Sequence, residues 1–112
     1  MLFRKIAKDI VKIMEDKKAK SVVLLDLKRI SVMADYFVIC TGESSLHMRS
    51  IAQELKNRLK EKGVELLNSR DFMDTRWILL DFGGVIVHIF SEEGRKFYQL
   101  ERLWADAKKV AW

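Results

Sequence analysis

The stretch WILLDFGGVIVHIF, residues 77–90, contains two runs of six mostly apolar residues separated by a pair of glycines. Glycine adopts positive φ angles at little cost, and a two-residue hairpin loop of type I′ requires positive φ at both central positions. We therefore predict a β-hairpin with Gly83 and Gly84 as its turn. In that register Trp77, at the start of the first strand, lies opposite Phe90, at the end of the second.

The hairpin register assigns alternating side chains to two faces of the sheet, because directly opposed residues share a face. One face is entirely apolar and is predicted to lie in the core: Ile78, Leu80, Phe82, Val85, Val87 and Ile89. The other face, which we call the mixed face, adds a carboxylate and an imidazole to large apolar side chains: Trp77, Leu79, Asp81, Ile86, His88 and Phe90.

The mixed face has an unusual composition for either a core or a solvent surface. A buried carboxylate such as Asp81 is rarely left unpaired, and solvent surfaces rarely expose several large apolar side chains together. This combination is typical of a protein–protein contact, in which an aromatic anchor supplies affinity and a polar group supplies specificity. The alternative is that the first or last helix covers this face, with Asp81 and His88 paired at its edge.

The remaining sequence predicts alternating helices and strands around the hairpin. Serine is a favoured N-cap and glycine a frequent helix terminator. The last helix begins between residues 92 and 95 and is expected to turn Phe97, Leu100, Trp104 and Ala107 inward. The earlier elements are a helix over residues 2–15, strands over 21–27 and 36–41, a helix from Ser44 or Ser45 to Gly63, and a weak strand over 64–68. We predict a single α/β domain over residues 1–112, a sandwich with a mixed, roughly five-stranded sheet flanked by helices.

Composition limits the classes of protein that this chain can belong to. Its 112 residues are 49% hydrophobic, which is enough for one core. The one cysteine, Cys40, lies in an apolar run and is predicted to be a small buried hydrophobe rather than a nucleophile. No apolar run approaches the ~20 residues that span a bilayer, and residues 1–6 lack the apolar core of a signal peptide. We therefore expect a cytoplasmic location and no membrane contact.

The sequence offers little support for catalysis. A histidine beside an aspartate is half of a nucleophilic triad, but no serine follows the G-x-S-x-G pattern. Two histidines and one cysteine have no metal-ligand spacing, and no phosphate-binding glycine loop is present. We predict no catalytic residue, no metal and no cofactor, and we interpret His47 as a solvated residue. The net charge of +5 is interpreted as solvated helix faces with mild attraction to RNA.

Four segments in order resemble the Iojap or ribosomal silencing factor family, over about residues 3–107: residues 35–47, 77–83, 87–90 and 95–104. The resemblance implies a fold similar to that of nucleotidyltransferases without their catalytic acidic cluster. It also implies binding to large-subunit ribosomal protein L-fourteen and a steric block of subunit joining, which lowers translation when nutrients are scarce. Two positions depart from the family pattern. Gly84 replaces a common aspartate, and residues 72–76 lack a glycine that often precedes the tryptophan.

The family's tryptophan and aspartate fall at Trp77 and Asp81, and its Val-His motif falls at Val87 and His88. These positions coincide with the mixed face that the hairpin register defines. The predicted protein-binding site is therefore Trp77, Leu79, Asp81, Ile86 and His88, with Phe90 and Tyr98 as supporting contacts.

Other interpretations remain open at this point. A nucleotidyltransferase-like enzyme would use the glycine-serine segment 42–45, although Asp81 lacks the acidic neighbour that two-metal catalysis needs. A large-subunit assembly factor would contact ribosomal RNA through the basic helices, and its complex would weaken steeply with salt. A second copy of the chain is a further candidate partner, because an apolar surface can pair with itself in the free protein.

Overall fold

The computed structural model describes residues 3–71, 76–103, 105 and 107–112. Its elements in chain order are α1 (Phe3–Asp16), β1 (Lys20–Asp26), β2 (Tyr36–Thr41), α2 (Ser45–Glu61), β3 (Asn68–Asp71), β4 (Trp77–Asp81), β5 (Val85–Phe90), α3 (Glu92–Tyr98), α4 (Leu100–Leu103) and β6 (Lys108–Lys109). None of the helices in this described part of the chain is long and apolar enough to cross a membrane.

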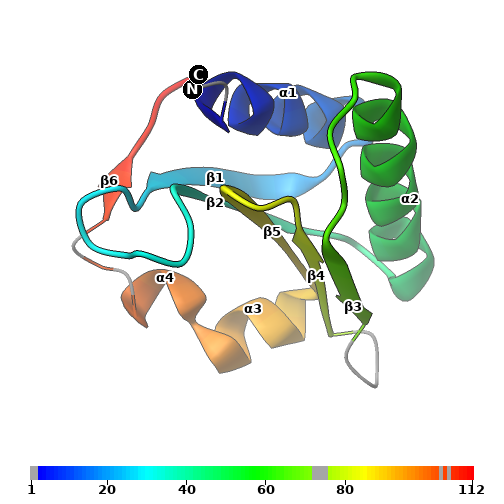
Figure 1. Ribbon diagram of the computed structural model, residues 1–112. Helices are drawn as coiled ribbons and strands as arrows, with labels where there is room; N and C mark the ends of the chain where they lie inside the picture. Colours follow the sequence, from blue (N-terminus) through cyan, green and yellow to red (C-terminus); the bar gives the residue numbers. More distant parts are fainter. Residues whose placement is uncertain (1–2, 72–75, 104, 106) are drawn as a thin grey trace.

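The strands form one mixed sheet in the order β3-β4-β5-β2-β1-β6. Only the β2–β5 pairing is parallel among the pairings of the described strands. Helices α1 and α2 cover one face, while α3 and α4 lie against the other (Figure 1). The predicted α/β sandwich with a mixed sheet is therefore confirmed, although the described residues form six strands rather than about five.

The hairpin has the predicted register, with Trp77 paired to Phe90 at one end and Asp81 paired to Ile86 at the other. The predicted I′ turn is wrong, because Gly83 has a φ of 90° whereas Gly84 is not in the positive-φ region. Positive φ at the first central residue alone is the pattern of a II′ turn.

Gly84 is needed for packing rather than for its φ angle. A Cβ atom at this position would lie 2.3 Å from the Phe3 ring at the start of α1. The Gly84 carbonyl also accepts hydrogen bonds from the amides of Asp35 and Tyr36, at 2.8 and 3.0 Å. These contacts join the hairpin turn to the first helix and to the loop that precedes β2.

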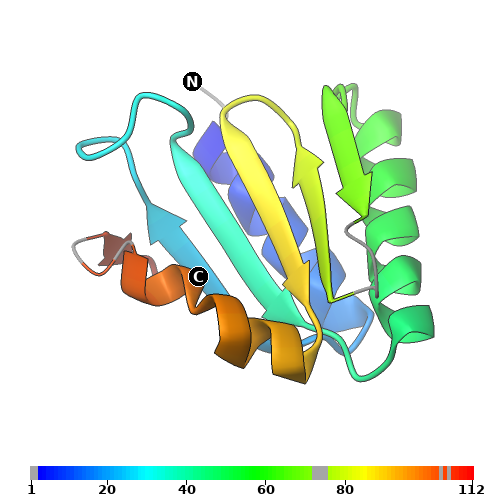
Figure 2. The same ribbon diagram turned by 90° about the horizontal axis from the view of Figure 1, so that it is seen from below.

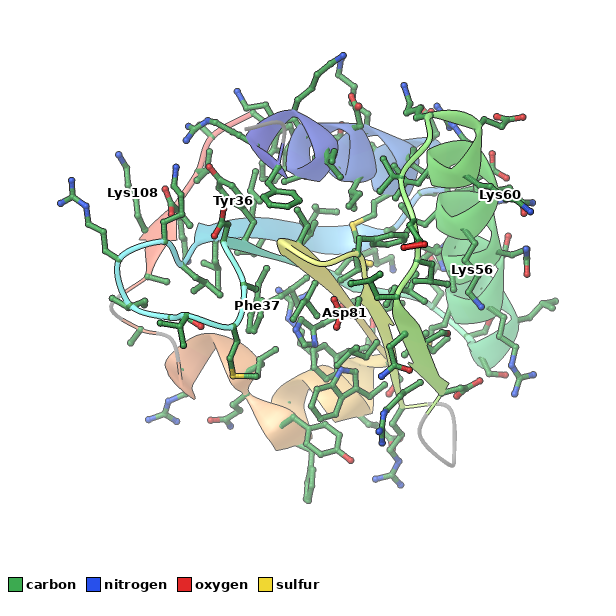
Figure 3. The ribbon with its side chains drawn as sticks, viewed as in Figure 1. Tyr36, Phe37, Lys56, Lys60, Asp81 and Lys108 are labelled. Carbon is green, nitrogen blue, oxygen red and sulfur yellow. The ribbon has the colours of Figure 1, made fainter. Side chains whose placement is uncertain are left out.

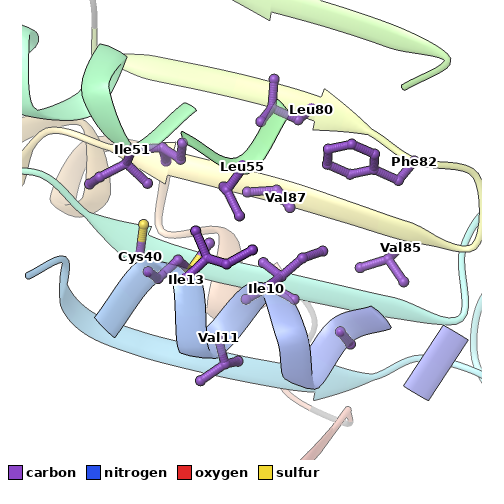
Figure 4. Packing of buried hydrophobic residues seen from close by; sticks show 14 of the residues in the cluster. Ile10, Val11, Ile13, Cys40, Ile51, Leu55, Leu80, Phe82, Val85 and Val87 are labelled. Carbon is purple, nitrogen blue, oxygen red and sulfur yellow. The ribbon is translucent and has the colours of Figure 1, made fainter. Parts of the chain in front are cut away.

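The larger core lies between the sheet and the α1–α2 layer (Figure 4). It contains every residue of the predicted apolar face of the hairpin, which confirms that assignment. Cys40 is fully buried in this core, and burial raises the pKa of its thiol to about 12. Its thiolate form is therefore scarce at neutral pH, as expected for a packing residue.

The start of α2 is held by side-chain hydrogen bonds. The Ser44 hydroxyl accepts the His47 amide at 3.0 Å, as predicted for an N-cap. The His47 ring is not a solvated group, because its Nδ1 atom accepts from the Glu43 amide at 2.9 Å. Its Nε2 atom lies 2.7 Å from the Lys17 carbonyl, which fixes the proton on Nε2. His47 therefore joins α2 to the turn after α1.

Two predictions about the second half of the chain are wrong. The weak strand begins at Asn68 and ends at Asp71, beyond the predicted residues 64–68. The last helix breaks at Gln99, whose φ of 44° and ψ of 47° are left-handed, so α4 turns away from α3. Leu100 is buried as expected, but Phe97 is 73% exposed. Trp104, also expected to point inward, lies outside the described residues.

Candidate protein-binding surface

The mixed face of the hairpin lies on the α3–α4 side of the sheet. Figure 3 shows Asp81 and Phe37 on this side and Tyr36 on the opposite side. The six residues differ in burial: His88 is 3% exposed and Phe90 is fully buried. The remaining four are half-buried: Trp77, Leu79, Asp81 and Ile86.

This gradient follows the position of α3. Seen from below, α3 and α4 cross the end of the sheet where β5 finishes, and the end near the hairpin turn is left open (Figure 2). Trp77 and Phe90 occupy the first end, and Asp81 and Ile86 occupy the second. The prediction that Trp77, Asp81 and His88 all face outward is therefore wrong for His88, because neighbouring aromatic rings cover it. Phe90, predicted as a supporting contact, is covered in the same way.

An aromatic cluster supports the covered end of the mixed face. The Trp77 ring lies 5.2 Å from Phe90 and 4.7 Å from Tyr98, measured between ring centroids. Phe37 of β2 meets the His88 ring edge-on at 4.5 Å. Such pairs add packing energy beyond the area they bury, so rings from β5 and α3 hold Trp77 in one orientation.

His88 acts on Trp77 directly. The indole Nε1–H of Trp77 donates to His88 Nδ1 at 3.1 Å. Burial lowers the pKa of His88 from 6.5 to about 3, so the ring is neutral at physiological pH. A neutral ring that accepts at Nδ1 carries its proton on Nε2, and this buried Nε2 has no hydrogen-bond partner among the described residues.

Asp81 lies at the open end of the mixed face. Its Oδ1 atom accepts the Gly83 amide at 2.8 Å, which ties the carboxylate to the hairpin turn. The carboxylate and the His88 imidazole sit diagonally across the strand pair but do not pair with each other. Because each has another partner, the alternative in which the two pair beneath a covering helix does not describe this site.

We define the candidate surface as Trp77, Leu79, Asp81 and Ile86, with Tyr98 of α3 at its border. Tyr98 is 37% exposed, and its ring connects the surface to Phe97 of α3 through an edge-on contact at 5.0 Å. These positions bring together one indole, two aliphatic side chains, one carboxylate and one phenol. The arrangement suits a contact in which apolar groups lose water and one charge selects the partner.

Sequence reasoning missed the apolar loop that joins β1 to β2. Val32 and Met33 are highly exposed there, at 106% and 76%. The loop reaches the hairpin turn through the Gly84 carbonyl, which accepts from the Asp35 amide. The sequence does contain a signal for this loop. Val32 and Met33 follow Lys28-Arg29, and a pair of charged residues of this kind would not occur within a buried strand.

No group of three or more histidine, cysteine, aspartate or glutamate side chains in the described residues is placed to hold a metal ion. The described features define a small α/β domain built on one mixed sheet, with helices on both faces and a partly apolar patch on one of them.

Comparison with known proteins then places the chain in a family. The family model described as "Ribosomal silencing factor during starvation" matches residues 3–111, and the chain belongs to this family. Ribosomal silencing factor RsfS of Halalkalibacterium halodurans is 44% identical over 100 residues, covering 89% of this chain and 86% of the relative. The Bacillus subtilis protein of the same name is 42% identical over 93 residues, covering 83% and 79%. The resemblance seen in the sequence is thereby confirmed.

Solved structures agree with the fold. A crystal structure of a Chromobacterium violaceum protein superimposes with a TM-score of 0.89 at 28% identity, covering 100% of this chain and 92% of that one. A Bacillus halodurans crystal structure gives a TM-score of 0.85 at 38% identity, covering 97% and 99%. The likeness to nucleotidyltransferases stays a prediction.

Proposed function

We propose that this protein binds the large ribosomal subunit through ribosomal protein L-fourteen and sterically keeps the small subunit away, which represses translation. The role is non-enzymatic, requires no cofactor and operates in the cytoplasm. Membership of the ribosomal silencing factor family supports it. The observation that carries it is the candidate surface, where half-exposed apolar side chains surround the Asp81 carboxylate.

The candidate surface provides both affinity and selectivity for such a partner. Leu79 and Ile86 lose water when covered, at a gain of roughly 25 cal/mol per Å² of apolar area. Trp77 is a rigid aromatic anchor, the type of residue that dominates many interfaces. Only Oδ1 of Asp81 has a partner among the described residues, so Oδ2 is available to accept from an arginine or lysine of the ribosomal protein.

Three members of the predicted site, the buried His88 and Phe90 and the more exposed Tyr98, act by supporting the Trp77 ring. His88 accepts from the indole, and Phe90 and Tyr98 pack against its ring. Fixing the rotamer before binding reduces the entropy lost on association. His88, Phe90 and Tyr98 therefore position Trp77, while Trp77, Leu79, Asp81 and Ile86 make the direct contacts.

The size of the molecule suits an occluding role. Its extents are 33 × 33 × 24 Å, so any docked orientation adds a layer more than 20 Å thick. Subunit association brings surfaces into direct contact, with typical protein contacts at ~4 Å. A body of these dimensions at the joining face prevents contact without changing the conformation of either subunit.

The proposal is tested with purified subunits. Trp77→Ala should weaken binding to large subunits by about 2 kcal/mol, roughly 30-fold in Kd, because truncation removes a central anchor. Asp81→Asn should weaken it less, since its shape is kept and only the charge is lost. Co-sedimentation measures the affinity, and light scattering of mixed subunits measures the block of joining.

Two exposed residues of α2 provide matched controls. Leu46→Ala removes an aliphatic side chain that is 76% exposed, and Glu61→Gln removes a charge from an exposed position. Both should bind and block as the unmodified protein does. If Trp77→Ala and Asp81→Asn proteins also co-sediment normally, the docking surface lies elsewhere. Sedimentation of the free protein tests whether a second copy covers the same surface.

A further inference from the structure

A basic pocket lies at the far edge of the sheet from the candidate surface. Its volume is about 370 Å³, and it opens where β1 ends and β6 pairs with it. The lining residues are Asp26, Lys28, Arg29, Ile30 and Lys108. Three of these side chains are cationic and one is anionic, so the pocket has a positive charge that its own residues do not neutralise.

The cations of this pocket differ in how they are held. The Lys28 ammonium lies 3.9 Å from Asp26 Oδ2 and 5.3 Å from the centre of the Tyr36 ring. Its pKa is raised, first by its interaction with the Tyr36 hydroxyl. Arg29 and Lys108 are both exposed, and the described residues supply neither of them with an ion pair. Lys28 therefore belongs to the framework, while the other two cations can meet an external anion.

A further cation approaches the same pocket from α1. The guanidinium of Arg4 lies 3.5 Å from the Tyr36 hydroxyl, so it stands beside the ring that holds Lys28. Three cationic side chains thus line the pocket and a fourth, Arg4, lies beside it, while the one acidic residue, Asp26, already has Lys28 as its partner. Clustering of this kind attracts anions more strongly than the same charges scattered over the surface.

Although they are separated across the sheet, the pocket and the candidate surface lie at the same end of it along the strand direction. Asp26 pairs with Tyr36, and Tyr36 pairs with Val85, which is next to Ile86 at the open end of the mixed face. Lys108 pairs with Asp26 on the outer edge. From β5 to β6 there are three strand spacings, about 14 Å in all. Asp26 and Tyr36 share the α1 side of the sheet, whereas Asp81 faces the other side (Figure 3), so a partner that reaches both features extends around the β1–β6 edge.

We propose that this pocket binds a backbone phosphate of RNA, with Arg29 and Lys108 as the contacting residues. The inference rests on the proposed function in one respect: a protein docked on a ribosomal subunit is surrounded mainly by RNA phosphates. The planar guanidinium of Arg29 can donate two parallel hydrogen bonds to phosphate oxygens, and Lys108 adds a mobile charge. Such contacts position a protein on RNA without reading its sequence.

The first test uses RNA alone and so does not depend on subunit docking. Fluorescence anisotropy of a labelled 20-nucleotide single-stranded RNA is followed as protein is added, at several salt concentrations. The double variant Arg29→Glu/Lys108→Glu should weaken binding about tenfold or more at low salt. Its slope of log affinity against log salt should fall by roughly 1.4, because each lost phosphate contact removes ~0.7 for single strands.

The matched control is Lys56→Glu/Lys60→Glu on α2, which makes the same change in net charge. Figure 3 shows both lysines at the opposite end of the molecule from Lys108. This protein should bind the RNA within about twofold of the unmodified chain. Equal weakening by both double variants would mean that binding follows net charge, and no binding at low salt would mean that no site exists; either result overturns the proposal.

Competitors separate the sources of negative charge. Unlabelled RNA should displace the labelled RNA at a far lower phosphate concentration than ATP or pyrophosphate does. Displacement by ATP at equal phosphate concentration would assign the pocket to a small phosphate ligand, and efficient displacement by polyglutamate would assign it to an acidic protein chain; both would overturn the RNA proposal. Trp77→Ala protein should retain full RNA binding while its binding to large subunits weakens, so failure of the docking surface and failure of the pocket are distinguishable.

Discussion

At the scale of single residues, His88 is the side chain whose burial matters most for the candidate surface. The ring is neutral because its surroundings disfavour the charged form, and only the neutral ring can accept the indole hydrogen bond at Nδ1. The folded protein binds a proton at this site only near pH 3, whereas the unfolded chain binds it near 6.5. Stability from this residue is therefore complete above about pH 6.5 and declines as the pH falls towards 3.

The pH dependence of unfolding tests this account. As the pH falls from 7 to 4.5, the buried neutral His88 is expected to lower the free energy of unfolding by roughly 2–3 kcal/mol. The variant His88→Gln has no imidazole to protonate in this pH range. Its free energy of unfolding should therefore fall by that much less between pH 7 and 4.5. Urea unfolding at four or five pH values gives both curves. Subtracting one curve from the other cancels the contribution of the carboxylates that both proteins share. Parallel curves would contradict burial of a neutral His88.

At the scale of elements, the sequence predicted those features that depend only on residues close together in the chain. The glycine pair predicted the hairpin register, and the serine before α2 predicted its N-cap, because turns and caps are decided within a few residues. Strand β3 was misplaced because its residues, Asn68–Asp71, are all exposed and carry no apolar alternation. It exists through pairing with β4, a contact that the strand's own sequence does not encode.

The candidate surface was likewise predictable only as far as it depends on local sequence. Alternation along the hairpin grouped the six side chains on one face, as the structure shows. It could not reveal that Phe37 and Tyr98, from two distant segments, cover His88 and Phe90. The break at Gln99 was equally hidden. A left-handed residue at a helix end is usually glycine or asparagine, so a glutamine at this position does not predict a break.

The contact between α3 and β4 makes a prediction about one glycine. A Cβ atom at Gly94 would lie 2.4 Å from the Arg76 backbone oxygen, which also accepts the Ser91 amide. Alanine is the better helix former by about 1 kcal/mol, yet Gly94→Ala should destabilise the protein by ~1–3 kcal/mol because backbone must move. Lys96→Ala, at an exposed position in the same helix, should be nearly neutral. Urea unfolding of both variants measures the difference, and a stabilised Gly94→Ala protein would show that α3 packs differently.

At the scale of the whole molecule, the two layers of helices differ in how firmly they are attached. The 14 residues of α1 and the 17 of α2 pack on the larger core. The 7-residue α3 and 4-residue α4 are short and separated by a left-handed residue. Arg95 holds α3 to the sheet by donating to the Ser21 carbonyl and the Thr41 hydroxyl, both at 2.9 Å. The thinner layer is the one that carries Tyr98 and borders the candidate surface.

This asymmetry predicts that the α3–α4 layer opens without global unfolding. Amides of residues 92–103 should exchange with deuterium at least tenfold faster than those of β2 and α1, because regions with few buried contacts open at lower free energy. Arg95→Ala should speed exchange in α3 further while leaving β2 unchanged. Mass spectrometry of peptic fragments resolves these segments. Bound large subunits should slow exchange in α3 if Tyr98 lies at the contact, whereas equal protection of α3 and β2 in the free protein would show that both layers unfold as one unit.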